Sequence, residues 1–176
     1  MKPKDTVIVL HLIGSHGPTY LDRYPPEYEK FKPICNTSNI QDCTSEQVRN
    51  TYDNTILYTD HILSTVIDTL KEAGGNNNTA MFYIADHGES LGENGIYLHG
   101  LPYSIAPIEQ KRVPMIVWMS KMFQGNNHID VNCLEKEAEQ KETHSQDNLF
   151  HSILGLMDVK TDLYKPSLDI FAKCRN

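Results

Sequence analysis

Three short apolar runs along the chain have the pattern of buried β-strands. They cover residues 6–13, 80–85 and 113–119, and their apolar residues are largely consecutive rather than alternating with polar ones. Strands of a parallel sheet that is covered on both faces have this pattern. We therefore expect residues 6–13 to form a central parallel strand and the other two runs to form strands as well.

Two further segments have apolar residues at helical spacing. Thr44 and Gln47 form a capping box at the start of the first segment, and the glycines at positions 74 and 75 are expected to end it. Ser145 is placed to cap the second segment, whose apolar residues are Leu149, Phe150, Ile153, Leu154 and Met157. The order strand, helix, strand, strand, helix predicts an α/β fold with helices covering a largely parallel sheet.

Length and charge narrow the class of protein. The chain has 176 residues, which fits one domain with a substantial core. Its net charge of −7 argues against a nucleic-acid partner, which would normally require a basic face. No apolar stretch approaches the roughly 18 residues that span a bilayer, so we expect these residues to be soluble.

Four cysteines bear on the redox compartment. Cys35 and Cys43 enclose a short polar stretch that would not bury either thiol, so a disulfide is expected rather than two free thiols. Cys133 and Cys174 are a second candidate pair, whose larger separation leaves the pairing open. Disulfides form in oxidising compartments, although the chain begins without an export signal. This mismatch suggests a piece of a longer protein.

Asp86 and His87 follow the second apolar run directly, and a glycine-rich loop comes after them. Ligands of open α/β sheets bind outside the carboxyl ends of the strands. One carboxylate oxygen and one imidazole nitrogen suit Zn²⁺, so this pair is a candidate metal site. The simpler interpretation is that both side chains cap backbone groups of a polar loop.

His16 and His99 are the other candidate site residues. His16 follows the first apolar run, and His99 lies on the loop that begins at Asp86. If the first two runs are neighbouring parallel strands, these histidines emerge beside the Asp86–His87 pair. They could then bind phosphate oxygens or a second zinc, or they could only hydrogen-bond to the backbone.

Several long motifs together resemble the bacterial lipid A phosphoethanolamine transferases, which include the colistin-resistance enzymes of the alkaline phosphatase and sulfatase superfamily. The motifs occupy residues 14–20, 23–28, 50–55, 86–95, 99–100 and 145–150. The resemblance implies an alkaline phosphatase-like α/β/α sandwich, present here in part. The 176 residues would be the C-terminal part of a periplasmic catalytic domain, and the full protein would be anchored in the inner membrane and act as a monomer.

The resemblance also implies a chemistry. Such enzymes move phosphoethanolamine from phosphatidylethanolamine to a phosphate of lipid A through a covalent phospho-threonine. In the family a glutamate, the threonine nucleophile, an aspartate and a histidine bind zinc, and the last two match Asp86 and His87. Family histidines that contact phosphoethanolamine or a second zinc match His16 and His99, and a family disulfide matches Cys35 and Cys43.

The anchor, the glutamate ligand and the threonine are expected to lie upstream of residue 1, so the fragment is expected to be inactive alone. Two alternatives stay open at this point. One is a metallohydrolase of the sulfatase or phosphodiesterase type, and the other is a module that binds zinc or phosphate without turnover.

Overall fold

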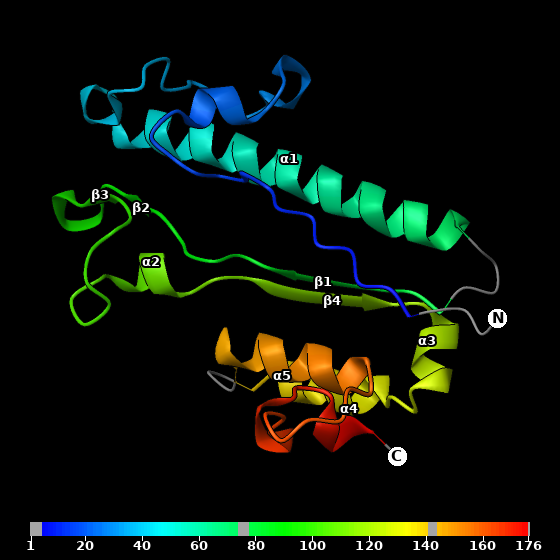
Figure 1. Cartoon of the computed structure of the whole chain (residues 1–176). Coiled ribbons are helices and arrows are strands. Elements are labelled where there is room, and N and C mark those ends of the chain that lie inside the picture. The colour runs from blue at the N-terminus through cyan, green and yellow to red at the C-terminus, as the bar shows by residue number, and fades with distance from the viewer. Residues whose placement is uncertain (1–4, 74–77, 141–143, 176) are drawn as a thin grey trace. The chain divides into compact units, whose positions relative to one another are not determined.

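The computed structural model (Figure 1) describes residues 5–73, 78–140 and 144–175. The chain divides into two compact units. The first, here called the histidine unit, consists of residues 9–69 and 85–115. The second, the C-terminal unit, consists of the described residues within 1–8, 70–84 and 116–176.

The longest element is helix α1, Ser45–Glu72. The capping box at its start is confirmed, because the Gln47 N–H donates to Thr44 Oγ1 at 3.2 Å and the Thr44 N–H donates to Gln47 Oε1 at 2.9 Å. Two of the backbone donors at the helix start are thereby satisfied. The glycines at 74 and 75 lie outside the described residues.

The polypeptide before α1 is irregular but firmly attached to this helix. Asn54 Oδ1 accepts hydrogen bonds from the N–H groups of Lys30 and Phe31 at 2.8 and 2.9 Å. Thr51 Oγ1 accepts one from the Cys35 N–H at 2.7 Å. Side chains of α1 thus replace the hydrogen bonds that regular structure would supply. The elements of this segment are the 3₁₀ turns η1 (Tyr20–Arg23), η2 (Pro26–Tyr28) and η3 (Ile40–Asp42).

A small apolar core lies inside the histidine unit. Tyr20, Cys35, Ile40 and Val48 are each at most 4% exposed and form one cluster. The disulfide between Cys35 and Cys43 is formed and closes the loop that carries Ile40. This core holds the segment after residue 19 against the start of α1.

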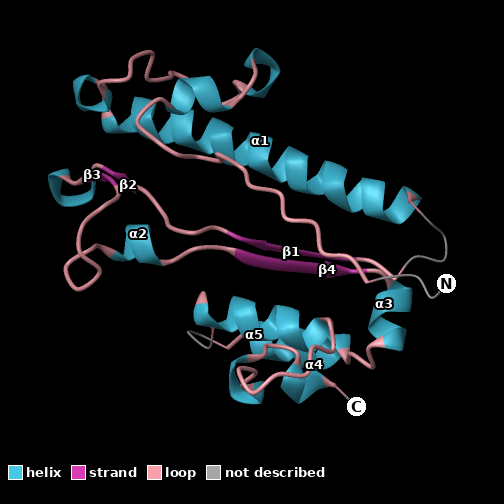
Figure 2. Cartoon of the chain, viewed as in Figure 1, coloured by secondary structure: helices cyan, strands magenta, loops and turns pink. Residues whose placement is uncertain are grey.

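Strands β1 (Ala80–Ile84) and β4 (Met115–Met119) pair in a two-stranded sheet (Figure 2). The Ser120 N–H donates to Thr79 O at 2.9 Å, and the Ala85 N–H donates to Pro114 O at 3.4 Å. These bonds make the pair antiparallel. The fold is α/β, as expected, but the pairing of these two strands differs from the parallel arrangement that their apolar composition favoured.

Residues 6–13 do not form a strand. Val7, Ile8, Val9 and Leu10 are between 51% and 85% exposed. A strand requires hydrogen bonds to a neighbouring strand, and the sheets of the described residues contain only β1 with β4 and β2 with β3. The composition of this segment is that of a central strand, but composition alone does not supply the partner.

The loop between β1 and β4 contains a short hairpin and one helical turn. Strand β2 (Ser90–Leu91) pairs antiparallel with β3 (Tyr97–Leu98), with Ser90 opposite Leu98. Helix α2 (Ile108–Lys111) follows before the chain enters β4. The hairpin belongs to the histidine unit and places residue 99 directly after β3.

The C-terminal unit is mostly helical. It contains α3 (Lys121–Asn126), α4 (Val131–Ala138) and α5 (Asp147–Leu156). A second disulfide joins Cys133 of α4 to Cys174, which resolves the pairing that the sequence left open. Among the residues that the structure describes, no helix has the length and apolar character needed to cross a membrane.

Ser145 lies one residue before the N-cap of α5, which is Gln146 and makes no side-chain capping bond, so the predicted cap is displaced by one residue. Ser145 Oγ accepts a hydrogen bond from the Asp147 N–H at 3.2 Å, and the Ser145 N–H donates to Asn148 Oδ1 at 2.7 Å. Further along this helix, buried Ser152 Oγ accepts from the Ile170 N–H at 3.1 Å. The bond between Ser152 and Ile170 ties α5 to the chain that follows it.

Candidate metal centre

Three histidines from three separate loops meet in the histidine unit. His16 lies in the turn after residue 13, His87 follows β1, and His99 follows β3. One ring nitrogen from each lies within 4.8 Å of the other two. The ring centroids of His16 and His99 are 4.9 Å apart, and those of His87 and His99 are 3.8 Å apart. The structure therefore brings together three of the four residues that the sequence singled out.

Hydrogen bonds define how the first two rings present their nitrogens. His16 Nδ1 lies 2.7 Å from Gly17 O, and His87 Nδ1 lies 3.0 Å from Gly88 O. A carbonyl oxygen only accepts, so each ring carries its proton on Nδ1 and keeps a lone pair on Nε2. Metal-binding histidines use this arrangement, in which an acceptor bonded to one ring nitrogen fixes the tautomer and the other nitrogen binds the metal.

The third ring has a stronger partner. His99 Nδ1 lies 2.9 Å from Glu89 Oε1, and the Glu89 side chain is only 3% exposed. The same carboxylate accepts hydrogen bonds from the Gly17 N–H at 3.4 Å and from the Tyr20 hydroxyl at 3.3 Å. Burial, and then the charge of Glu89, raises the pKa of Tyr20 far above its ordinary value, so Tyr20 stays a neutral donor. Glu89 was not among the residues predicted from the sequence, although it lies two residues after His87.

Asp86 lies at the edge of this cluster. Its side chain is 87% exposed, and its Oδ2 is 3.9 Å from His87 Nε2. Its Oδ1 accepts a hydrogen bond from the His87 N–H at 3.1 Å. Two ligands of a tetrahedral zinc are roughly 3.3 Å apart when both bonds are about 2.0–2.1 Å long. The pair is thus close to the separation that zinc requires, and the donor set of imidazole nitrogens and one carboxylate suits this metal.

The loop that carries His16 is held from two sides. Arg23 Nε donates to His16 O at 3.0 Å, and the Thr55 hydroxyl on α1 lies 2.6 Å from Ser15 Oγ. Gly17 is required by space, because a Cβ there would lie 2.9 Å from the Tyr20 hydroxyl oxygen. Its hydrogen atom in place of a side chain lets this loop pack closely against Tyr20 and Leu98.

The turn after His87 is equally tight. The Gly88 N–H donates to Gln110 O at 3.0 Å, and Gln110 Nε2 donates to Ser90 Oγ at 2.9 Å. A Cβ at Gly88 would collide with the backbone carbonyl of Glu109. The residues around α2 therefore fix the backbone position of Gly88, next to His87.

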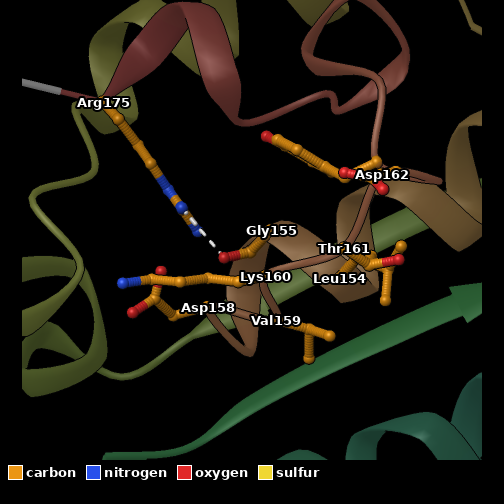
Figure 3. Close-up of a pocket in the computed structure, with 9 residues that line it drawn as sticks. Leu154, Gly155, Asp158, Val159, Lys160, Thr161, Asp162 and Arg175 are labelled. Atoms are coloured by element: carbon orange, nitrogen blue, oxygen red, sulfur yellow. Dashed lines mark hydrogen bonds between the residues drawn. The ribbon is translucent and has the colours of Figure 1, made fainter.

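A pocket of about 690 Å³ lies elsewhere, in the C-terminal unit (Figure 3). Arg175 points across it, and its Nη1 donates to Gly155 O at 2.9 Å. Its charged lining residues are Asp158, Lys160, Asp162 and Arg175. Two acidic and two basic groups give no net charge that would select a phosphate, and none of the predicted site residues lines this pocket.

Comparison with known proteins identifies the class. Residues 2–159 match the Sulfatase family, so the chain belongs to the sulfatase family. It is 56% identical to the phosphoethanolamine transferase EptA of Escherichia coli K12 over 171 aligned residues. These residues make up 97% of this chain and 31% of that protein. It is 43% identical to the phosphatidylethanolamine transferase Mcr-1 of Escherichia coli over 162 aligned residues. These residues make up 92% of this chain and 28% of that protein.

Solved structures agree with this assignment. The soluble domain of lipooligosaccharide phosphoethanolamine transferase A from Neisseria meningitidis superposes with a TM-score of 0.92 at 46% identity, covering 98% of this chain and 52% of that one. A zinc complex of the periplasmic domain of EptC from Escherichia coli superposes with a TM-score of 0.73 at 26% identity, covering 92% of this chain and 43% of that one. The chain spans about a third of the length of the curated relatives it matches.

Proposed function

We propose that this chain is part of a phosphoethanolamine transferase that moves phosphoethanolamine from phosphatidylethanolamine to a phosphate of lipid A, and so confers resistance to polymyxins such as colistin. The observation that carries the proposal is the convergence of His16, His87 and His99, with ring nitrogens within 4.8 Å of one another. The similarity to relatives named as phosphoethanolamine transferases supports it.

The metal in this proposal is zinc, bound by Asp86 and His87 together with ligands from the rest of the protein. When bound, zinc polarises phosphoryl oxygens and lowers the pKa of a coordinated hydroxyl group. His16 and His99 then contact the phosphate oxygens of the substrate, or a second zinc, through Nε2. The existence of a zinc complex of the similar EptC domain supports this choice of metal.

Transfer proceeds in two displacements at phosphorus. In the first, a threonine oxygen forms a bond to phosphorus and the bond to the diacylglycerol oxygen breaks; that oxygen leaves with a proton. In the second, an oxygen of a lipid A phosphate bonds to the phosphorus, the bond to the threonine oxygen breaks, and that oxygen regains its proton. The histidines stabilise charge on the phosphoryl oxygens that do not exchange. We place the threonine and the glutamate ligand outside these 176 residues, so this part alone is inactive.

The proposed location is the periplasmic face of the inner membrane, where both substrates are accessible. Two disulfides, Cys35–Cys43 and Cys133–Cys174, support an oxidising compartment. In this scheme the membrane anchor belongs to another part of the complete protein.

The test is mass spectrometry of lipid A from bacteria that lack their own transferases and express the complete protein. We expect lipid A to gain one phosphoethanolamine and the cells to tolerate more colistin, and we expect His16→Ala or His99→Ala to abolish both effects. A folded, membrane-inserted protein that leaves lipid A unmodified would contradict the proposal. Release of ethanolamine phosphate to water without an acceptor would indicate a hydrolase instead.

A further inference from the structure

We propose that Glu89 is a positioning residue, which fixes the tautomer of His99 and holds the loop of His16 against it. This inference rests on the proposed function, in which both histidines contact phosphate or metal. Glu89 acts through these two residues rather than by touching the substrate.

Glu89 contacts His99 directly. Glu89 Oε1 is 2.9 Å from His99 Nδ1, and the Glu89 side chain is 3% exposed, so water does not compete for this carboxylate. An ionised carboxylate only accepts hydrogen bonds, and the proton between the two groups therefore belongs to Nδ1. The lone pair of His99 is then on Nε2, where it is available to a metal or to a phosphate proton.

Glu89 also contacts the segment that carries His16. The same Oε1 accepts from the Gly17 N–H at 3.4 Å, and Oε2 accepts from the Tyr20 hydroxyl at 3.3 Å. Gly17 is the residue next to His16, so one carboxylate is attached to the segments that carry both histidines. A buried charge is costly unless it is hydrogen-bonded, and these three donors offset that cost while fixing the two loops.

The tautomer of His99 is the direct readout. Nitrogen-15 NMR of metal-free, histidine-labelled protein distinguishes a protonated Nδ1 from a protonated Nε2, and His99→Gln identifies the His99 signals. We expect the Nδ1–H form in the unaltered protein and in Glu89→Gln, whose amide oxygen can still accept. In Glu89→Ala we expect a shift towards the Nε2–H form. Glu93→Gln is the matched control, because Glu93 bonds instead to the backbone N–H of Leu91 at 2.7 Å.

Zinc affinity separates a positioning role from a purely structural one. We expect Glu89→Ala to weaken zinc binding at the cluster of His16, His87 and His99 by about 10–100-fold, as is usual when the acceptor of a ligating histidine is lost. The loss should be much smaller in a His99→Ala background, because Glu89 then has no ring to orient. If Glu89→Ala does not fold, Glu89→Gln is compared in the same two backgrounds, with a smaller loss that must also depend on His99.

The inference is overturned if His99 carries its proton on Nε2 in the unaltered protein, or if the effect of Glu89 on zinc affinity is equal with and without His99. Neither measurement uses lipid A. A failure of transfer with the expected tautomer would therefore count against the proposed function, and normal transfer with an unchanged tautomer in Glu89→Ala would count against this inference.

Discussion

The imidazole rings of His87 and His99 stack on each other, with centroids 3.8 Å apart and planes inclined by 29°. The two residues come from different loops, one after β1 and one after β3. Each ring is therefore part of the surface against which the other lies. Substitution of one is expected to change both the number of ligands and the orientation of the remaining ring.

His87→Ala should reduce zinc affinity by more than about tenfold, since even the loss of an outer-shell partner costs 10–100-fold. Asp86→Ala combined with His87→Ala should reduce it further. Isothermal titration calorimetry with zinc measures the zinc affinity of both variants. His144→Ala is the control, because His144 is exposed and lies in the C-terminal unit. Equal affinities for the double variant and the unaltered protein would show that the pair is not a metal site.

Gly17→Ala should disturb the cluster without changing any ligand. The new Cβ would lie 2.5 Å from Leu98 Cδ2 and 2.9 Å from the Tyr20 hydroxyl, which must move apart. We expect weaker zinc binding and lower transferase activity of the complete protein. Gly125→Ala is the matched control, since nothing lies within 4 Å of its added Cβ. An unchanged zinc affinity in Gly17→Ala would mean that the close packing of this loop against Tyr20 and Leu98 is not needed.

Asn54→Ala should destabilise the histidine unit by about 1–3 kcal/mol, because it removes the buried amide that accepts two partly buried hydrogen bonds from the N–H groups of Lys30 and Phe31. Urea denaturation, followed by circular dichroism, measures the free energy of unfolding. Asn50→Ala, which removes one exposed hydrogen bond to Pro33 O, should cost less than about 1 kcal/mol. Similar values for both variants would contradict the anchoring role of Asn54.

The two disulfides should differ in their contribution to stability. Their sequence separations are 8 residues for Cys35–Cys43 and 41 residues for Cys133–Cys174. Loop-closure entropy then predicts losses of roughly 2.5 and roughly 4 kcal/mol when each pair is replaced by serine. The same denaturation experiment compares the two variants. A larger loss for Cys35–Cys43 would show that contacts in the folded state, rather than chain entropy, dominate.

Stability should fall at alkaline pH through Tyr164. Burial, and then a hydrogen bond to Asp169, raises the pKa of Tyr164 from 10.0 to about 12. The neutral form is favoured by folding, so this contribution is complete below pH 10 and is lost as the pH rises towards 12. Absorbance at 295 nm during base titration follows the ionisation. Tyr164→Phe should remove this part of the pH dependence, and an unchanged profile would contradict the assignment.

Local features of the fold could be predicted from the sequence. The capping box of Thr44 and Gln47 depends on residues three apart, and both of its hydrogen bonds are present. The segment 6–13 could not be predicted in the same way, because a strand depends on a partner that composition does not reveal. The direction of pairing between β1 and β4 is likewise a property of two distant segments.

In the candidate site too, features set by neighbouring residues could be predicted and features that depend on distant segments could not. His87 was found because it adjoins Asp86 at the end of an apolar run, and that signal is local. Glu89 was missed because its role depends on Gly17 and Tyr20, which are 72 and 69 residues away in the sequence. An acidic residue in a glycine-rich loop is ordinarily solvated, and only the folded chain shows that this one is buried.

The hydrogen bond from the Ala85 N–H to Pro114 O has one more consequence. The stretch from residue 86 to residue 113 departs from the paired strands and rejoins them at the same place. Its two ends are thus fixed next to each other, as the ends of an interchangeable cassette would be. Chimeras that exchange this stretch with that of a relative should keep the strand register and transfer His87, Glu89 and His99 as a set.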